Sequence, residues 1–191
     1  MSRLLQPFPP LISLIGFMGA GKTTVGRILA EKLEYDFIDT DELVVARAGR
    51  PIAEIFEEQG ETAFRLLESE AIRSLTARVR AVIAAGGGAP AQESNQVFFR
   101  VHAITFHLRV SVENARDRAL AMEAPARPLL MQELSAVQRL FDERQTIYES
   151  LGTPVETDGC APGEVAENII ELLNRRPKGN RRAGGRPVNE T

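Results

Sequence analysis

A glycine-rich segment with one lysine stands directly behind an apolar run near the start of the chain, LIGFMGAGKTTVG at residues 14–26. Gly16, four further residues and then Gly21-Lys22-Thr23 reproduce the spacing of a phosphate-binding P-loop. We predict that Lys22 neutralises charge that grows on the phosphates and that the Thr23 hydroxyl ligates Mg²⁺. The alternative is a glycine-rich turn without a ligand. The residues predicted to bind the phosphates are Gly19, Ala20, Gly21, Lys22, Thr23 and Thr24.

Two carboxylates, Asp39 and Asp41, stand in FIDTD at the end of the next apolar run. The carboxyl ends of parallel strands meet at one edge of a sheet, so both side chains are expected to face the P-loop. We predict that Asp39 holds Mg²⁺ through its water and that Asp41 takes the proton of an acceptor hydroxyl. The alternative is helix capping, for which Asp41 is well placed before ELVVARAG.

Three consecutive glycines, Gly86, Gly87 and Gly88, follow a third apolar run in AAGGGAP. Without side chains, they let the backbone approach a ligand closely and leave its amides accessible to an anion. We therefore predict that they form the floor of a binding site, the alternative being a flexible turn.

Short apolar runs alternate with longer helical patterns along the chain, which predicts an α/β protein with a parallel sheet. The expected strands are residues 11–15, 36–39, 81–85, 104–108 and 154–157. After the first helix, which follows the P-loop, the expected helices are residues 61–78, 111–120, 135–151 and 163–174.

Composition limits the classes of partner. A chain of 191 residues with 43% apolar side chains fits one domain, and a net charge of −3 gives no long-range attraction to nucleic acid or to a membrane. The single cysteine, Cys160, excludes an internal disulfide and favours a reducing cytoplasm. Prolines close to the start argue against a cleaved signal peptide. We expect a monomer acting on small molecules, with residues 175–191 forming a disordered, solvated basic tail; the alternative for this tail is contact with nucleic acid.

The motifs GFMGAGKTTVG, FIDTD, IAEIFEEQGETAFRLLE, GGGA, RPLL and RQTIY occur in the order and approximate spacing found in shikimate kinases. The chain resembles this family of small P-loop enzymes over residues 11–173. The resemblance implies a three-layer P-loop kinase fold, with a five-stranded parallel sheet flanked by helices and a mobile lid at residues 119–131, in one domain over residues 1–174. It also implies transfer of the ATP γ-phosphate to the 3-hydroxyl of shikimate, a step of aromatic amino-acid biosynthesis by the chorismate route.

The resemblance places the shikimate site at Asp41, Arg65, Arg144 and the three glycines Gly86, Gly87 and Gly88. Two arginines for a carboxylate and one aspartate for hydroxyl groups are complementary to shikimate. The alternative for each arginine is a surface ion pair, because Glu61, Glu68 and Glu143 are near in sequence. Glu61 is expected to orient Arg65 or to cap its helix.

For the nucleotide, the family pattern places Arg118 and the loop TDGCAPGE near adenine, with Pro162 packed on the ring. Arg127, in EAPARPLL, is expected to lie on the lid and to stabilise charge that develops on the phosphates. The predicted catalytic residues are thus Lys22, Asp41 and Arg127. The two histidines, His102 and His107, lack a metal-ligand spacing and are expected to be structural.

Three other functions are compatible with a P-loop. A gluconate-type kinase would share the nucleotide site but would need no carboxylate clamp of this form, so Arg65 and Arg144 discriminate against it. A GTP-dependent switch would carry an Asn-Lys-x-Asp guanine signature, which the chain lacks. A catalytically dead regulatory relative is disfavoured because the chain retains Lys22, Thr23, Asp39, Asp41 and Arg127.

Overall fold

The fold is built on one five-stranded sheet with the strand order β2-β3-β1-β4-β5, in which all neighbouring strands run parallel. The structure is a computed structural model that describes residues 11–120 and 134–176. The sheet confirms the predicted class, and no strand boundary is shifted by more than one residue. The strands are β1 (Leu11–Ile15), β2 (Asp36–Asp39), β3 (Ala81–Ala84), β4 (Ile104–Arg109) and β5 (Thr153–Glu156).

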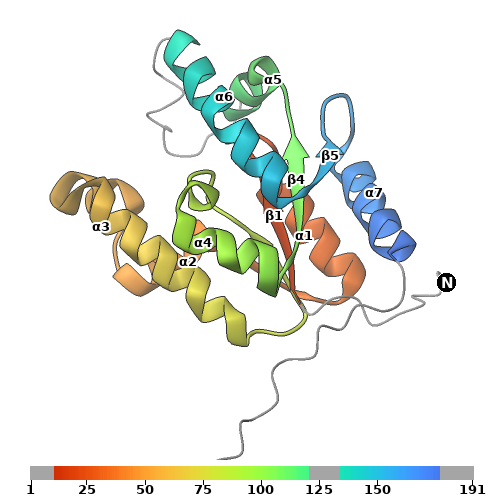
Figure 1. The fold of residues 1–191 in the computed structure, drawn as a ribbon, viewed down its shortest axis with the longest axis horizontal. Helices are drawn as coiled ribbons and strands as arrows, with labels where there is room; N and C mark the ends of the chain where they lie inside the picture. The colour runs from red at the N-terminus through yellow and green to blue at the C-terminus, as the bar shows by residue number, and fades with distance from the viewer. Residues whose placement is uncertain (1–10, 121–133, 177–191) are drawn as a thin grey trace, which may run out of the picture.

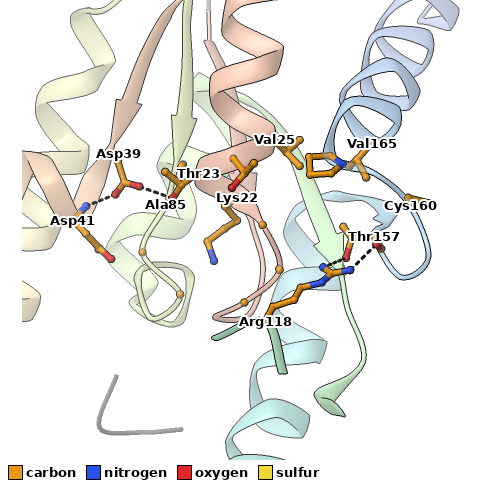
Figure 2. A pocket seen from close by; sticks show the side chains of 18 residues that line it. Lys22, Thr23, Val25, Asp39, Asp41, Ala85, Arg118, Thr157, Cys160 and Val165 are labelled. Carbon is orange, nitrogen blue, oxygen red and sulfur yellow. Dashed lines mark hydrogen bonds between the residues drawn. The ribbon is translucent and has the colours of Figure 1, made fainter. Parts of the chain in front are cut away.

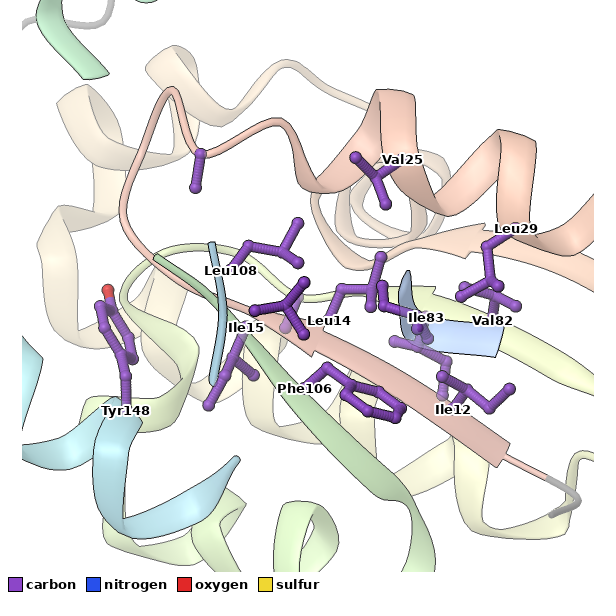
Figure 3. Packing of buried hydrophobic residues seen from close by; sticks show 14 of the residues in the cluster. Ile12, Leu14, Ile15, Val25, Leu29, Val82, Ile83, Phe106, Leu108 and Tyr148 are labelled. Carbon is purple, nitrogen blue, oxygen red and sulfur yellow. The ribbon is translucent and has the colours of Figure 1, made fainter. Parts of the chain in front are cut away.

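Helices cover both faces of this sheet, giving the predicted three layers (Figure 1). Side chains on β1 and β4 alternate between the two faces. A Cβ atom at Gly26 of the first helix would lie 3.4 Å from Leu14, whereas the His107 ring contacts that of Tyr148 on the opposite face. Figure 3 shows Val25 of the first helix and Tyr148 on opposite sides of β1. The helices are α1 (Lys22–Leu33), α2 (Thr40–Ala48), α3 (Ile52–Ser74), α4 (Glu93–Val97), α5 (Val112–Leu120), α6 (Leu134–Leu151) and α7 (Pro162–Arg175).

The third helix, α3, differs most from the prediction of a helix over residues 61–78. It already begins at Ile52, and it is kinked at Gly60, where the backbone leaves helical geometry with φ 78° and ψ 175°. The second part of α3 ends at Ser74, after which Leu75–Ala77 form a 3₁₀ turn. A separate apolar cluster of Val44, Ile55, Phe64 and Ala71 packs α2 against α3. This packing fixes the helix that carries Arg65.

Several predictions concern residues that the structure does not describe. Arg127 and residues 121–131 of the predicted lid lie outside the described ranges, as does all of the predicted tail beyond residue 176. The lid, the tail and the single domain over residues 1–174 therefore stay predictions. Within residues 11–120 and 134–176, no helix combines the length and the apolar character needed to cross a membrane.

Candidate active site

The loop between β1 and α1 adopts a conformation that favours glycine at two positions, Gly19 and Gly21. Gly19 has a φ of 79°, and a Cβ atom there would lie 2.2 Å from the carbonyl oxygen of Ala115 on α5. Gly21 is the N-cap of α1 with a φ of 87°. The Nζ atom of Lys22 donates to the carbonyl oxygens of Gly16 and Phe17, each at 2.9 Å. The ammonium group is therefore held against the loop itself, at the N-terminus of a helix, where an anion is favoured.

A pocket of about 400 Å³ opens over this loop. Figure 2 shows Lys22 between the Asp39–Asp41 segment and Arg118. All residues predicted to bind the nucleotide line the pocket, apart from Arg127, which is not described. The pocket is also lined by residues that follow or end β2 and β3, and by Val25, Ala84, Ala85, Thr157, Cys160 and Val165. The residues that the sequence predicted for the site and that line this pocket are Gly19, Ala20, Gly21, Lys22, Thr23, Thr24, Asp39, Asp41, Gly86, Gly87, Arg118 and Pro162.

The Asp39 carboxylate joins two elements at the wall of the pocket. Its Oδ2 atom accepts a hydrogen bond of 2.8 Å from the Thr23 hydroxyl, and its Oδ1 atom accepts one of 3.0 Å from the Asp41 amide. Asp39 is therefore the N-cap of α2, so the capping alternative holds for Asp39 and is wrong for Asp41, because the helix begins at Thr40, two residues before the start that an Asp41 cap would give. A hydroxyl and a carboxylate oxygen held together suit Mg²⁺, which prefers oxygen ligands and keeps several of its waters.

The glycine run approaches the predicted acceptor residues closely. A Cβ atom at Gly86 would lie 2.5 Å from Oδ1 of Asp41, and one at Gly88 would lie 2.5 Å from both terminal nitrogens of Arg65. A Cβ atom at Gly87 would lie 3.7 Å from Nη1 of Arg144. The structure thus brings Asp41 on α2, Arg65 on α3 and Arg144 on α6 around the glycine run that follows β3. We name Gly86, Gly87 and Gly88 the glycine floor.

Arg65 forms two ion pairs on its own helix. Its Nη2 atom lies 3.0 Å from Glu61, and its Nη1 atom lies 2.9 Å from Glu68. The Glu61 pair agrees with the prediction that this residue orients Arg65. The Glu68 pair is no surface contact, because the Glu68 side chain is only 1% exposed. The surface alternative is therefore wrong for this pair.

Glu68 is a site residue that sequence reasoning considered only as a surface partner. A Cβ atom at Gly86 would lie 2.7 Å from its Oε1 atom, so the carboxylate abuts the glycine floor. Burial raises the pKa of Glu68, Asp41 adds to the shift, and Arg65 opposes it. Its position three residues after Arg65 places both side chains on one helix face, which is the signal that could have identified it.

At the other end of the pocket, Arg118 on α5 is bound to the loop that precedes α7. Its Nη1 and Nη2 atoms donate to the hydroxyl and the carbonyl oxygen of Thr157, at 3.1 and 2.8 Å (Figure 2). Asp158 accepts a hydrogen bond of 2.9 Å from the Ser111 amide and so attaches the same loop to the start of α5. Arg118 and Pro162 consequently line one cavity, as predicted for an adenine site.

Comparisons with known proteins agree with this arrangement. The profile of the shikimate kinase family matches residues 18–174. A shikimate kinase from Thermodesulfovibrio yellowstonii is 40% identical over 170 residues, which cover 88% of this chain and 97% of that protein. A solved shikimate kinase from Acinetobacter baumannii, in complex with shikimate, superposes with a TM-score of 0.82 at 36% identity, over 88% of this chain and 94% of the other.

A gluconokinase from Sinorhizobium meliloti shares the fold alone. It is 19% identical, with a TM-score of 0.61, over 89% of this chain and 94% of the other. The family profile and the 40% identical relative both span most of the sequence that forms the pocket and the glycine floor. On this evidence the chain belongs to the shikimate kinase family.

Proposed function

We propose that this protein transfers the γ-phosphate of ATP to the 3-hydroxyl of shikimate and releases ADP and shikimate 3-phosphate. One observation carries the proposal. The glycine floor borders the P-loop pocket through Gly86 and Gly87, and it also abuts two carboxylates and two arginines. A donor phosphate and a carboxylate-bearing acceptor can therefore lie side by side.

ATP binds with its phosphates against the P-loop amides and its adenine between Arg118 and Pro162. Lys22 is bonded to two loop carbonyls, and its long side chain can turn from them to the outer phosphates of ATP. The positive end of α1 and the lysine then offset the phosphate charge that grows during transfer. The Thr23 hydroxyl and, through water, Asp39 would hold Mg²⁺. When bound, it neutralises charge on the phosphate oxygens.

The acceptor binds over the glycine floor. Arg65 uses three of its five N–H groups on Glu61 and Glu68, which leaves one at each terminal nitrogen for a ligand. Together with Arg144, these donors suit the carboxylate of shikimate. Asp41 accepts the proton of the 3-hydroxyl as its oxygen bonds to the γ-phosphorus and the bond to the β-γ bridging oxygen breaks.

The last residue of the proposed mechanism is Arg127, whose role rests on the sequence alone. From the motif EAPARPLL we assign its guanidinium to the bridging and γ-phosphate oxygens of ATP, where an arginine stabilises the charge that develops during transfer. We further propose that the protein works as a monomer in the cytoplasm on small molecules, without nucleic acid or membrane partners.

The test is ADP production from ATP and Mg²⁺ with a panel of acceptors: shikimate, gluconate and nucleoside monophosphates. Shikimate should give turnover at least a hundredfold above the others. Lys22→Met should remove almost all turnover without unfolding the protein, because this side chain stabilises charge and contributes little packing. Turnover with gluconate in place of shikimate would support the alternative kinase, and a folded Lys22→Met variant with a near-native rate would overturn the nucleotide site.

A further inference from the structure

Two buried hydroxyl groups hold the glycine floor from opposite sides. The Gly86 amide donates a hydrogen bond of 2.8 Å to the Thr40 hydroxyl, and the Tyr148 hydroxyl donates one of 2.6 Å to the Gly87 carbonyl oxygen. Thr40 has no exposed surface, and Tyr148 is 1% exposed. Hydrogen bonds of buried groups are costly to lose, because neither partner can turn to water instead.

Tyr148 connects the floor to the helix that carries Arg144. The two residues are four apart on α6 and therefore lie on one helix face. Arg144 faces Gly87, where an added Cβ atom would lie 3.7 Å from its Nη1 atom. The bond from Tyr148 to Gly87 thus sets how far Arg144 stands from the floor.

The Tyr148 ring is held in place from the sheet side. The His107 ring on β4 lies 5.2 Å from it between centroids, at an angle of 46°, and His107 is fully buried. Burial raises the pKa of Tyr148 to about 12, so its hydroxyl remains a donor throughout the physiological range. The donor is consequently fixed in direction and protonated at physiological pH.

Thr40 makes the equivalent connection on the other side. It stands between Asp39 and Asp41 at the start of α2, and its hydroxyl holds Gly86 where a Cβ atom would lie 2.5 Å from Oδ1 of Asp41. Its bond therefore sets the distance between the proposed base and the floor.

We infer that Thr40 and Tyr148 are positioning residues that hold the glycine floor at a fixed spacing from Asp41 and Arg144, and thereby determine the affinity for the acceptor. The inference rests on the proposed function of the floor as the acceptor site. Neither hydroxyl lines the P-loop pocket. The acceptor and the nucleotide should therefore respond differently when these hydroxyl groups are removed.

The experiment uses Tyr148→Phe and Thr40→Val, which remove the hydroxyl groups and retain most of the side-chain volume. Each should raise the KM for shikimate by roughly tenfold, the scale of one lost buried hydrogen bond, while the KM for ATP changes less than twofold. Thr40→Ser retains the acceptor oxygen and should recover most of the affinity. Tyr35→Phe is the matched control, because it removes a tyrosine hydroxyl just before β2, at the end of that strand opposite Asp39.

Shikimate binding is also measured by calorimetry, and thermal unfolding gives the folded fraction of each variant. Unchanged shikimate affinity in folded Tyr148→Phe and Thr40→Val, or equal losses of shikimate and ATP affinity, would overturn the inference. A wild-type protein that phosphorylates another acceptor would overturn the proposed function instead. The same variants would then be tested with that acceptor, and a selective rise in its KM would support the positioning role.

Discussion

The Thr23 hydroxyl donates a hydrogen bond of 2.8 Å to the Asp39 carboxylate, which ties the first turn of α1 to the end of β2. The other oxygen of the same carboxylate caps α2 through the Asp41 amide. One side chain thus aligns the phosphate loop with the helix that carries the proposed base. In the proposed function, the same hydroxyl and carboxylate oxygens would hold hydrated Mg²⁺.

Asp39→Asn separates these two roles, because asparagine is an equally good N-cap but lacks the negative charge. We expect the Mg²⁺ concentration for half-maximal activity to rise by about 10- to 100-fold, the scale seen when residues that support a metal are removed. The melting temperature should change little. Activity as a function of Mg²⁺, with thermal unfolding as the control, makes the test. An unchanged Mg²⁺ dependence would leave Asp39 as a cap only.

Asp41→Asn removes the proposed proton acceptor without changing the shape of the side chain. We expect kcat to fall roughly 10²-fold or more, because a positioned base contributes on that scale. ATP binding, measured by calorimetry, should be retained, since the P-loop is unaltered. Full activity of the variant would mean that the carboxylate does not take the hydroxyl proton.

Arg144→Ala tests the carboxylate clamp. Loss of a charge-assisted hydrogen bond should raise the KM for shikimate by about 10- to 100-fold, with the KM for ATP unchanged. Steady-state kinetics with each substrate varied in turn separate the two effects. A rise confined to the KM for ATP would show that the acceptor site has been misplaced.

Arg65→Ala also tests the carboxylate clamp, but it affects the stability of the protein as well. It would leave the buried Glu68 carboxylate without its partner at 2.9 Å, which costs about 3 kcal/mol or more of stability. The double variant Arg65→Ala/Glu68→Gln removes that buried charge. It should recover stability but not the affinity for shikimate.

His107→Phe tests a pH dependence of stability. Burial, aided by the charges of Arg109 and Lys22, lowers the pKa of His107 from 6.5 to about 4. Between these two pH values the unfolded chain binds the proton and the folded chain does not, so the free energy of unfolding falls as the pH drops from 6.5 to 4. Above pH 6.5 the imidazole is neutral in both states and contributes nothing to the pH dependence.

The phenylalanine variant should lack this loss, which amounts to roughly 3 kcal/mol for the whole shift. It also removes two buried ring nitrogens that have no hydrogen-bond partner among residues 11–120 and 134–176. Urea unfolding of both proteins at several values between pH 7 and pH 4 measures the difference. A difference that stays constant across this range would contradict a neutral buried imidazole.

Arg127→Ala should lower kcat roughly 10²-fold or more, with little change in thermal stability, because its proposed role is to stabilise transferring charge. Arg127→Lys should restore only part of the rate, since an ammonium group cannot reproduce the planar fork. Kinetics at saturating ATP and shikimate provide the measurement. A kcat equal to that of the wild type would assign the stabilising charge to another residue.

Local patterns in the sequence determined the sheet and the phosphate site. Strand propensity predicted all five strands to within a residue, and the spacing from Gly16 to Thr23 placed the P-loop, because a loop, its lysine and the helix that follows are contiguous in the chain. The carboxyl-end rule for parallel strands also predicted correctly that Asp39, Asp41 and the glycine floor would lie at the same edge of the sheet.

Only the tertiary structure decided which groups are buried and which meet across elements. Glu68 and a surface glutamate look alike in sequence, yet the packing of α3 beside the glycine floor makes one of them a buried partner of Arg65. The contacts of Tyr148 with Gly87 and with His107 join α6 to the floor and to β4, across 61 and 41 positions of the chain. Such contacts follow from the relative placement of whole elements, which depends on the summed packing of the core, so no local pattern of residues specifies them.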